Sequence, residues 1–215
     1  MNHISPESRY IVPDFEERTP YGVRHINPYS KLFEDRVIFL ATAVDSASAT
    51  DVVSQLLALN AMDPTAPISL YLNSPGGLMT DMSMIIDTMN YITAPVATLA
   101  LGQAASAASV ILAAGHPGMR RALPNARIMI HQPRNQGSGG HQASDIEIYA
   151  KEFEFLRTSL EEFLSDRTGK PVEEIRLDLE RDKFLSAKEA LEYGIIDQVV
   201  ETNVAPLRVI TEKAG

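Results

Sequence analysis

Short apolar runs alternate with amphipathic or alanine-rich segments along residues 37–130 of the chain. The runs that have the length of buried strands are 37–40, 68–72, 96–101 and 127–130. Helical spacing, capping residues or alanine-rich composition predict helices over 48–60, 78–92 and 106–114. A repeated strand–helix order of this kind predicts an α/β fold with a largely parallel sheet.

A longer amphipathic pattern covers residues 145–168. Ser144 and Glu147 have the spacing of a capping box, apolar residues then recur every three or four positions, and Gly169 ends the pattern. A helix of about 24 residues is roughly 35 Å long. Because this length is similar to the width of a small domain, we expect the helix to project and to pack against another subunit. The alternative is a long surface helix of a monomer.

The composition narrows the class of protein. The 215 residues fit one domain, and 45% of them are hydrophobic, which is enough for a core without covalent staples. Cysteine is absent, which excludes disulfides, a catalytic thiol and thiolate metal sites. The net charge of −9 argues against nucleic-acid binding, which usually requires a basic face. No apolar stretch approaches the roughly 20 residues of a membrane helix, and the polar start lacks a signal-peptide core, so a cytoplasmic protein is expected.

Charge is distributed unevenly along the chain. No lysine or arginine occurs between Arg36 and Arg120, which indicates that this segment forms the buried core. Residues 145–201 hold 16 acidic and 8 basic side chains, so most of the negative charge follows that core.

Ser106 is the first candidate for chemistry, because it lies between the predicted strand 96–101 and the apolar helix that follows. A serine at this place is ordinarily a helix cap. Backbone N–H groups at a helix N-terminus also stabilise an anion, which suits the oxyanion formed during acyl transfer. Gly76 and Gly77 follow the strand that ends at Asn73 and offer a second place where the backbone can approach a ligand, although a tight turn is their ordinary role.

A nucleophilic serine requires a base, and His131 is the best-placed histidine. It ends the predicted strand 127–130, and sites in α/β folds gather at strand ends; a structural histidine is the alternative. The other histidines fall in the N-terminal arm or in surface turns: His3, His25, His116 and His141. The acid that orients the imidazole has several candidates after His131, and spacing does not choose among them. They are Asp145, Asp166, Asp178, Asp182 and Asp197.

Several short motifs, in order and at matching intervals, resemble one known family. They are PYSKLFEDRVIFL at 28–40, NSPGG at 73–77, GQAAS at 102–106, ALPNAR at 122–127, IHQP at 130–133, ERDKFLS at 180–186 and EYGIID at 192–197. Each motif is weak by itself. Together they make the chain similar to the proteolytic subunits of the Clp protease family from about residue 10 to residue 200.

The resemblance implies a serine endopeptidase that hydrolyses unfolded proteins to small peptides. Ser106 would be the nucleophile, His131 the general base and acid, and Asp182 the residue that orients His131. The backbone N–H groups of Gly77 and Ala107 would form the oxyanion hole. The family pattern implies no metal and no cofactor in this subunit.

The resemblance also implies a crotonase-like α/β head with a long handle helix. The protease domain would cover residues 31–200, with the handle over 132–168 and a C-terminal tail over 201–215. Residues 1–30 would form an N-terminal arm that lines an axial pore at Ile11, Val12 and Pro13, and residues 1–8 are a candidate propeptide. In the family, two heptameric rings meet through their handles and enclose a chamber that holds the sites.

The implied partner is a AAA+ unfoldase of the Clp type, which uses ATP; nothing in this chain resembles a P-loop. Glu180 and Arg181 match the pair that makes contacts between rings. Tyr71 and Tyr91 match the docking pocket for the unfoldase. Ser69 stands where many relatives have a tyrosine, so this pocket is expected to differ.

Two further departures from the family pattern leave alternatives open. Ala107 and Ala108 replace the commoner Met-Gly. The Ala-Ala pair resembles one of two paralogous actinobacterial subunits, which assemble as mixed rings. Rings of this chain alone and mixed rings are therefore both open. The glycine-rich segment 134–142, expected beside the substrate, is about two residues longer than in the commonest family members. One alternative function is a non-catalytic scaffold that activates a paralogue. Another is a crotonase-type acyl-CoA enzyme, which shares the fold but needs no Ser-His-Asp triad.

Overall fold

Among the residues that the structure describes, the central sheet has seven strands. They are β3 (Val37–Leu40), β4 (Ile68–Ser74), β5 (Val96–Ala105), β6 (Arg120–Ala122), β7 (Arg127–Ile130), β8 (Lys183–Ser186) and β9 (Gln198–Val199). The computed structural model describes residues 14–20, 22–134 and 142–200. The order β3–β4–β5–β6–β9 is parallel throughout, and β7 pairs in parallel with β5 and antiparallel with β8. The predicted α/β fold with a largely parallel sheet is therefore confirmed.

Strand β5 is long because it has two successive neighbours. Its residues 98–100 pair with β6, and its residues 103–105 pair with β7. Strand β8 then lies beside β7, with Lys183 opposite Ile130. The residues that follow β5 and β7 and the residue that precedes β8 consequently meet at one edge of the sheet.

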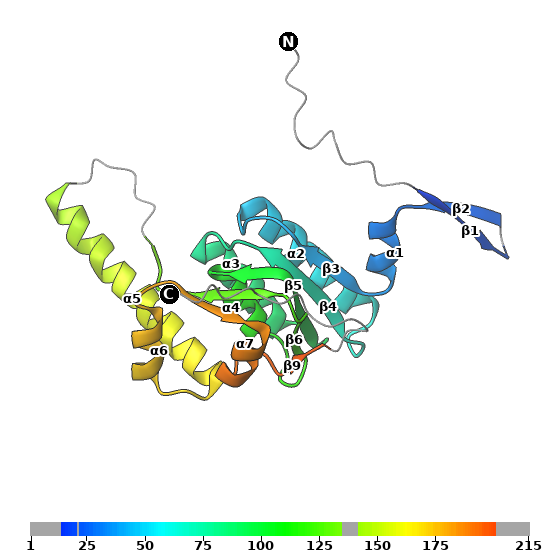
Figure 1. The fold of residues 1–215 in the computed structure, drawn as a ribbon. Coiled ribbons are helices and arrows are strands. Elements are labelled where there is room, and N and C mark those ends of the chain that lie inside the picture. Colours follow the sequence, from blue (N-terminus) through cyan, green and yellow to red (C-terminus); the bar gives the residue numbers. More distant parts are fainter. Residues whose placement is uncertain (1–13, 21, 135–141, 201–215) are drawn as a thin grey trace, which may run out of the picture.

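Helices cover the sheet and close the core (Figure 1). Besides the long helix α5 they are α1 (Pro28–Glu34), α2 (Ser46–Met62), α3 (Met79–Tyr91), α4 (Ala107–Ala113), α6 (Val172–Leu179) and α7 (Ala187–Tyr193). Leu56 of α2, Leu72 of β4 and Ile111 of α4 are fully buried together in this core. Burial of such a side chain contributes about 1.5–3 kcal/mol. The segment 37–119, which contains no lysine or arginine, is therefore the main source of hydrophobic stabilisation.

Helix α2 begins at Ser46, two residues before its predicted start at Ser48. The Asp45 carboxylate accepts the Ser48 N–H at 2.8 Å, and the Ser48 hydroxyl accepts the Asp45 N–H at 3.0 Å. This reciprocal capping box satisfies two N–H groups that the first turn leaves free. Ser48 is thus the third residue of the helix and not its cap.

Helix α5 (Ala143–Thr168) is the predicted long helix, and it projects from the head on the side opposite the N-terminal hairpin (Figure 1). It ends at Gly169, whose φ of 75° is the left-handed cap conformation that the sequence predicted. The predicted capping box is wrong in its residues. The Asp145 carboxylate, and not Glu147, accepts the N–H of Gln142, at 3.3 Å.

The two halves of α5 have different surroundings. Leu160 and Leu164 in the second half are buried against the head. The first half carries exposed large apolar side chains, namely Ile146, Ile148, Tyr149 and Phe155. An exposed apolar surface of this kind is typical of a contact with another protein.

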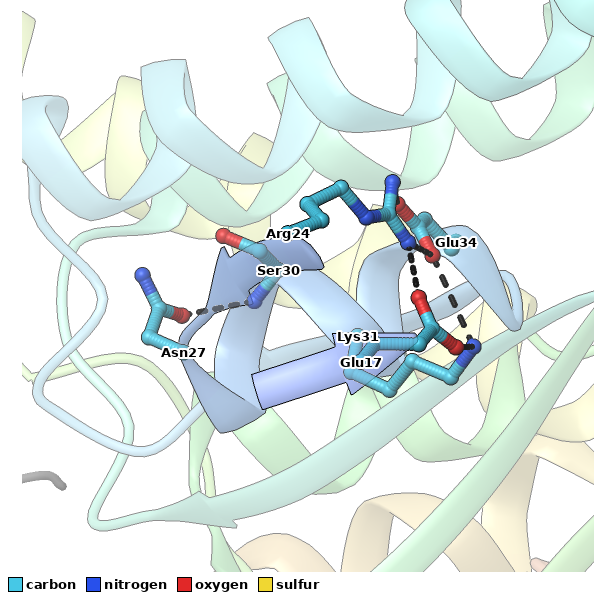
Figure 2. A network of polar contacts seen from close by, with 6 residues as sticks. All are labelled: Glu17, Arg24, Asn27, Ser30, Lys31 and Glu34. Carbon is cyan, nitrogen blue, oxygen red and sulfur yellow. Dashed lines mark hydrogen bonds and ion pairs between the residues drawn. The ribbon is translucent and has the colours of Figure 1, made fainter. Parts of the chain in front are cut away.

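The predicted N-terminal arm is folded as a hairpin of β1 (Phe15–Thr19) and β2 (Gly22–Ile26) where the structure describes it. Figure 2 shows the Arg24 guanidinium bonded to both Glu17 and Glu34, while Lys31 Nζ lies 3.3 Å from Glu17. These ion pairs tie the hairpin to α1. Because they are exposed, salt is expected to weaken the attachment. The predicted pore residues, the propeptide and the tail lie outside the described residues.

Candidate active site

Ser106 lies in a sharp turn between β5 and α4. Its φ is 55° and its ψ is −127°, a conformation that costs a non-glycine residue about 1–3 kcal/mol. The Ser106 N–H donates to Met129 O at 2.8 Å, which holds the turn against β7. The hydroxyl makes no capping hydrogen bond to α4, so the ordinary role of a helix cap is wrong for this serine. The backbone instead directs Ser106 toward the end of β7.

His131 is the first residue after β7, and its imidazole faces Ser106. The distance from His131 Nε2 to Ser106 Oγ is 2.8 Å, which is a hydrogen bond from the hydroxyl when Nε2 carries no proton. The parallel pairing of β5 with β7 makes this contact, because it brings the ends of the two strands together. The imidazole is mostly buried, with 11% of the side chain exposed. A serine bonded to a buried histidine is the arrangement of an activated nucleophile.

Asp182 immediately precedes β8, and the antiparallel pairing of β7 with β8 places it beside His131. Asp182 Oδ1 lies 3.2 Å from His131 Nδ1, but Nδ1 is buried and has no hydrogen bond among the described residues. The guanidinium of Arg134 is bonded to the same carboxylate oxygen. The separation is thus short enough for an ion pair, while the relative orientation of ring and carboxylate does not complete a hydrogen bond.

The structure brings only one of the five candidate aspartates to His131. Asp178 binds Lys183 and the Tyr193 hydroxyl. Asp197 pairs with the buried Arg120, through contacts as short as 2.6 Å. Asp145 is at the start of α5, and Asp166 is near its end. Their ordinary structural roles explain why spacing along the chain could not choose among them.

The electrostatics keep His131 neutral. Burial lowers the pKa of the imidazole below its ordinary value of 6.5, and the positive charge of Arg134 lowers it further, while Asp182 acts in the opposite direction. The Arg134 guanidinium also holds the pKa of the Asp182 carboxyl below its ordinary 3.8. A neutral imidazole beside an ionised carboxylate is the state in which a histidine can accept a proton.

The glycine turn after β4 packs directly against the Ser106 turn. Gly76 has φ of 91°, and a Cβ there would lie 2.5 Å from Ala105 O. A Cβ on Gly77 would lie 1.9 Å from Val44 O. Within the described ranges, the N–H groups of Gly77 and Ala107 have no hydrogen-bond acceptor, so both are free to donate to a ligand. The prediction that these two N–H groups form an oxyanion hole has the required donors.

A cavity of about 600 Å³ opens in front of Ser106. It is lined by the glycine turn, the start of α4, His131 and the segment that follows it. Phe153, Leu156 and Leu160 of α5 form its apolar wall. A second cavity of about 530 Å³ adjoins it on the side of Arg134 and Asp182. The volume and the largely apolar lining are those of a ligand-binding site.

Within the part of the chain that the structure describes, no group of three or more histidine, aspartate or glutamate side chains could hold a metal ion. The same residues include no helix both long and apolar enough to cross a membrane. A site without metal or cofactor remains a prediction from the sequence.

A comparison with family models matches residues 20–203 to the family described as Clp protease. The chain belongs to the Clp protease family. It is 54% identical over 196 residues to the ATP-dependent Clp protease proteolytic subunit 1 of Corynebacterium diphtheriae, a match that covers 91% of this chain and 93% of the relative. It is 56% identical over 196 residues to proteolytic subunit 2 of Streptomyces coelicolor, with 91% and 89% covered. The resemblance inferred from the motifs, including its actinobacterial character, is confirmed.

The other residues matched to the Clp protease family have varied surroundings. Glu180 lies near Arg157 of α5, with 3.5 Å between Oε2 and the guanidinium, whereas Arg181 is exposed and has no ion-pair partner within the described residues. Tyr71 packs edge-on against Phe39 at a centroid distance of 5.5 Å. The other residues of the predicted docking pocket are Ser69, which is half-buried, and Tyr91, which is 83% exposed. Most of the predicted glycine-rich segment, residues 135–141, is outside the described residues.

Sequence reasoning missed Arg134 and Gln132. Gln132 donates its N–H to Leu179 O at 2.8 Å and its side-chain amide to Glu180 O at 3.0 Å, which positions the segment before Asp182. Gln132 follows His131 directly, and Arg134 is the first residue after the IHQP motif. Their position close after His131 was the available signal. The partners of Gln132 and Arg134 could not be identified before the pairing of β7 with β8 was known.

Proposed function

We propose that this chain is the serine endopeptidase subunit of a barrel-shaped, ATP-dependent Clp protease, in which Ser106, His131 and Asp182 are the catalytic triad. The observation that carries the proposal is the 2.8 Å contact between Ser106 Oγ and His131 Nε2 at a strained turn beside free N–H groups. The curated relatives named as proteolytic subunits of that protease support it.

The chemistry follows from the geometry. Ser106 Oγ attacks the carbonyl carbon of the scissile peptide bond while His131 Nε2 accepts its proton. The N–H groups of Gly77 and Ala107 stabilise the oxyanion of the tetrahedral intermediate. His131 then gives the proton to the leaving amine, and a water molecule, activated in the same way, hydrolyses the acyl-enzyme. Asp182 orients the imidazole and stabilises its charged form.

Labelling with a fluorophosphonate tests this proposal, because such reagents form a covalent adduct with an activated serine. We expect one adduct, located on Ser106 by peptide mass spectrometry, in the assembled particle. A crotonase-type acyl-CoA enzyme would bind coenzyme A in a calorimeter and leave Ser106 unlabelled, and that pair of results would contradict the proposal.

We further propose assembly as two heptameric rings that meet through α5, either of this chain alone or mixed with a paralogous proteolytic subunit. The exposed apolar side chains on the first half of α5 support a contact of this kind. The rings would receive unfolded proteins from a AAA+ unfoldase that uses the ATP, so the subunit itself needs no cofactor. A cytoplasmic location, and the absence of nucleic-acid and membrane partners, remain predictions from the sequence.

Replacement of Arg181 by glutamate tests the assembly. Arg181 is exposed in the single subunit, so its charge is available for the contact between rings. We expect Arg181→Glu to convert double rings to single rings on a sizing column and to reduce peptide hydrolysis at least tenfold, because a like charge at an interface costs several kcal/mol. Lys188→Glu, an exposed reversal on α7, is the matched control and should leave both readouts unchanged. Intact, active double rings of Arg181→Glu would contradict the assignment.

A further inference from the structure

Arg134 and His131 both approach one oxygen of Asp182. The Arg134 guanidinium is bonded to Oδ1, and His131 Nδ1 lies 3.2 Å from that same atom. In a working triad the Nδ1–H donates to the carboxylate, which fixes the tautomer and stabilises the imidazolium that forms. Here Nδ1 is buried and unbonded among the described residues, although its expected acceptor is adjacent. A buried polar atom without a partner requires an explanation.

We propose that Arg134 is a positioning residue that competes with His131 for the Asp182 carboxylate. This competition holds the rate of peptide hydrolysis below the rate that the same triad reaches when Asp182 accepts a hydrogen bond from His131 alone. This inference rests on the proposed function. Arg134 acts through Asp182 and does not touch the scissile bond, so it is not a catalytic residue. It lines both the cavity in front of Ser106 and the adjoining cavity, which places its charge within reach of bound peptide.

The location of Arg134 explains how it can leave Asp182. Its side chain is 62% exposed, whereas that of His131 is 11% exposed. The arginine is therefore free to choose other partners, such as an acidic group of a bound peptide, while the imidazole is fixed by its surroundings. Departure of the guanidinium would leave Oδ1 to accept the Nδ1–H with no movement of the backbone.

Few other charges act on His131. Glu180 and Arg181 line the adjoining cavity together with Asp182 and Arg134, and they carry opposite charges. In the described parts of α4, of the glycine turn and of α5, no charged side chain lines the cavity in front of Ser106. Among the described residues, Arg134 is the positive charge that lowers the pKa of His131, and Asp182 is the group that raises it.

The replacement Arg134→Leu tests the proposal, with the rate of fluorophosphonate labelling of Ser106 measured against pH in the full chain. The reaction needs neutral His131, so the rate rises as the pH passes upward through the pKa of that imidazole. Removal of Arg134 removes a cause that lowers this pKa and frees the carboxylate that raises it. We expect the acid limb to move to higher pH and the alkaline plateau to rise by roughly tenfold, equal to about 1.4 kcal/mol. A limb at higher pH together with a higher plateau is a combination that a merely structural role of Arg134 would not produce.

Three further variants sharpen the test. Arg134→Lys keeps a positive charge, so the acid limb of its labelling rate should stay at the lower pH of the unmodified chain. Arg121→Leu removes an arginine from β6, away from both cavities, and should match the unmodified chain. In an Asp182→Asn background, Arg134→Leu should no longer raise the plateau, since no carboxylate is left to release. An unmoved limb in Arg134→Leu, or a plateau gain that persists in Asp182→Asn, overturns the inference. Failure of the unmodified chain to label at Ser106 overturns the proposed function as well, so the two failures are distinguishable.

Discussion

Replacement of Ser106 by alanine is expected to lower peptide hydrolysis by roughly 10⁴–10⁶-fold, because no other group can form the acyl-enzyme. The fold should persist. The hydroxyl contributes one hydrogen bond, to His131, while the turn is held by the Ser106 N–H and by packing against Gly76. The measurement is kcat/KM with a fluorogenic peptide, in rings that contain only this chain, with a sizing column to verify assembly.

Ser83→Ala is the matched control, since Ser83 is exposed on α3 and does not itself line the cavity. It should leave hydrolysis unchanged. The same pair of variants separates the endopeptidase from the scaffold suggested by Ala107 and Ala108. Two results together would favour the scaffold: mixed rings with Ser106→Ala hydrolyse peptide as fast as unmodified mixed rings, and rings of this chain alone hydrolyse none. The triad would then have no catalytic role in this chain.

Replacement of Gly77 by alanine is expected to impair both hydrolysis and stability. The added Cβ would lie 1.9 Å from the carbonyl oxygen of Val44, a backbone atom that cannot rotate away. The Val44 N–H to Gly76 bond and the Leu78 N–H to Val44 bond, both 2.9 Å, must then break or lengthen. Displacing the Gly77 N–H removes one oxyanion donor, which typically reduces kcat by about 10²–10³-fold. A loss of unfolding free energy of about 3 kcal/mol is expected from a backbone clash of this kind.

Gly118→Ala controls for the general effect of adding a methyl group to a turn glycine. Its φ is 83°, and a Cβ there meets no atom within 4 Å, so only backbone strain of about 1–2 kcal/mol is expected. Hydrolysis should be unaffected, because Gly118 does not line the cavity. Kinetic assays and denaturant unfolding of the two variants give both quantities. Normal kcat in Gly77→Ala would show that its N–H does not serve the oxyanion.

The strand and helix pattern was sufficient to predict the sheet, because buried parallel strands leave short apolar runs that neighbouring helices separate. It also indicated Ser106 and His131, since strand ends gather at one edge of such a sheet. Asp182 could not be derived in that way. Its approach to His131 depends on the antiparallel pairing of β7 with β8, which joins residues far apart in the chain, and only the family motif supplied it.

Three features of the structure could not be predicted from the order of residues. The bond between Arg134 and Asp182 requires both side chains to turn toward the same cavity, and nothing in the order of residues fixes that. The positive φ of Ser106 is similarly invisible, because the chain has alanines where a glycine-flanked nucleophile turn would have glycines. The start of α2 was misplaced since Asp45 and Ser48 are both good capping residues, and only geometry distinguishes their positions.

The absence of lysine and arginine from residues 37–119, which form strands and helices of the core, has a consequence for locating a labelled serine. Trypsin cuts after lysine and arginine, so it leaves Ser106 within one very large apolar peptide that runs from Val37 to Arg120. Such a peptide is poorly recovered and poorly fragmented in a mass spectrometer. Chymotrypsin cuts after large apolar residues and can release Ser106 between Leu101 and Leu112. A negative tryptic result would therefore report on the digestion and not on the nucleophile.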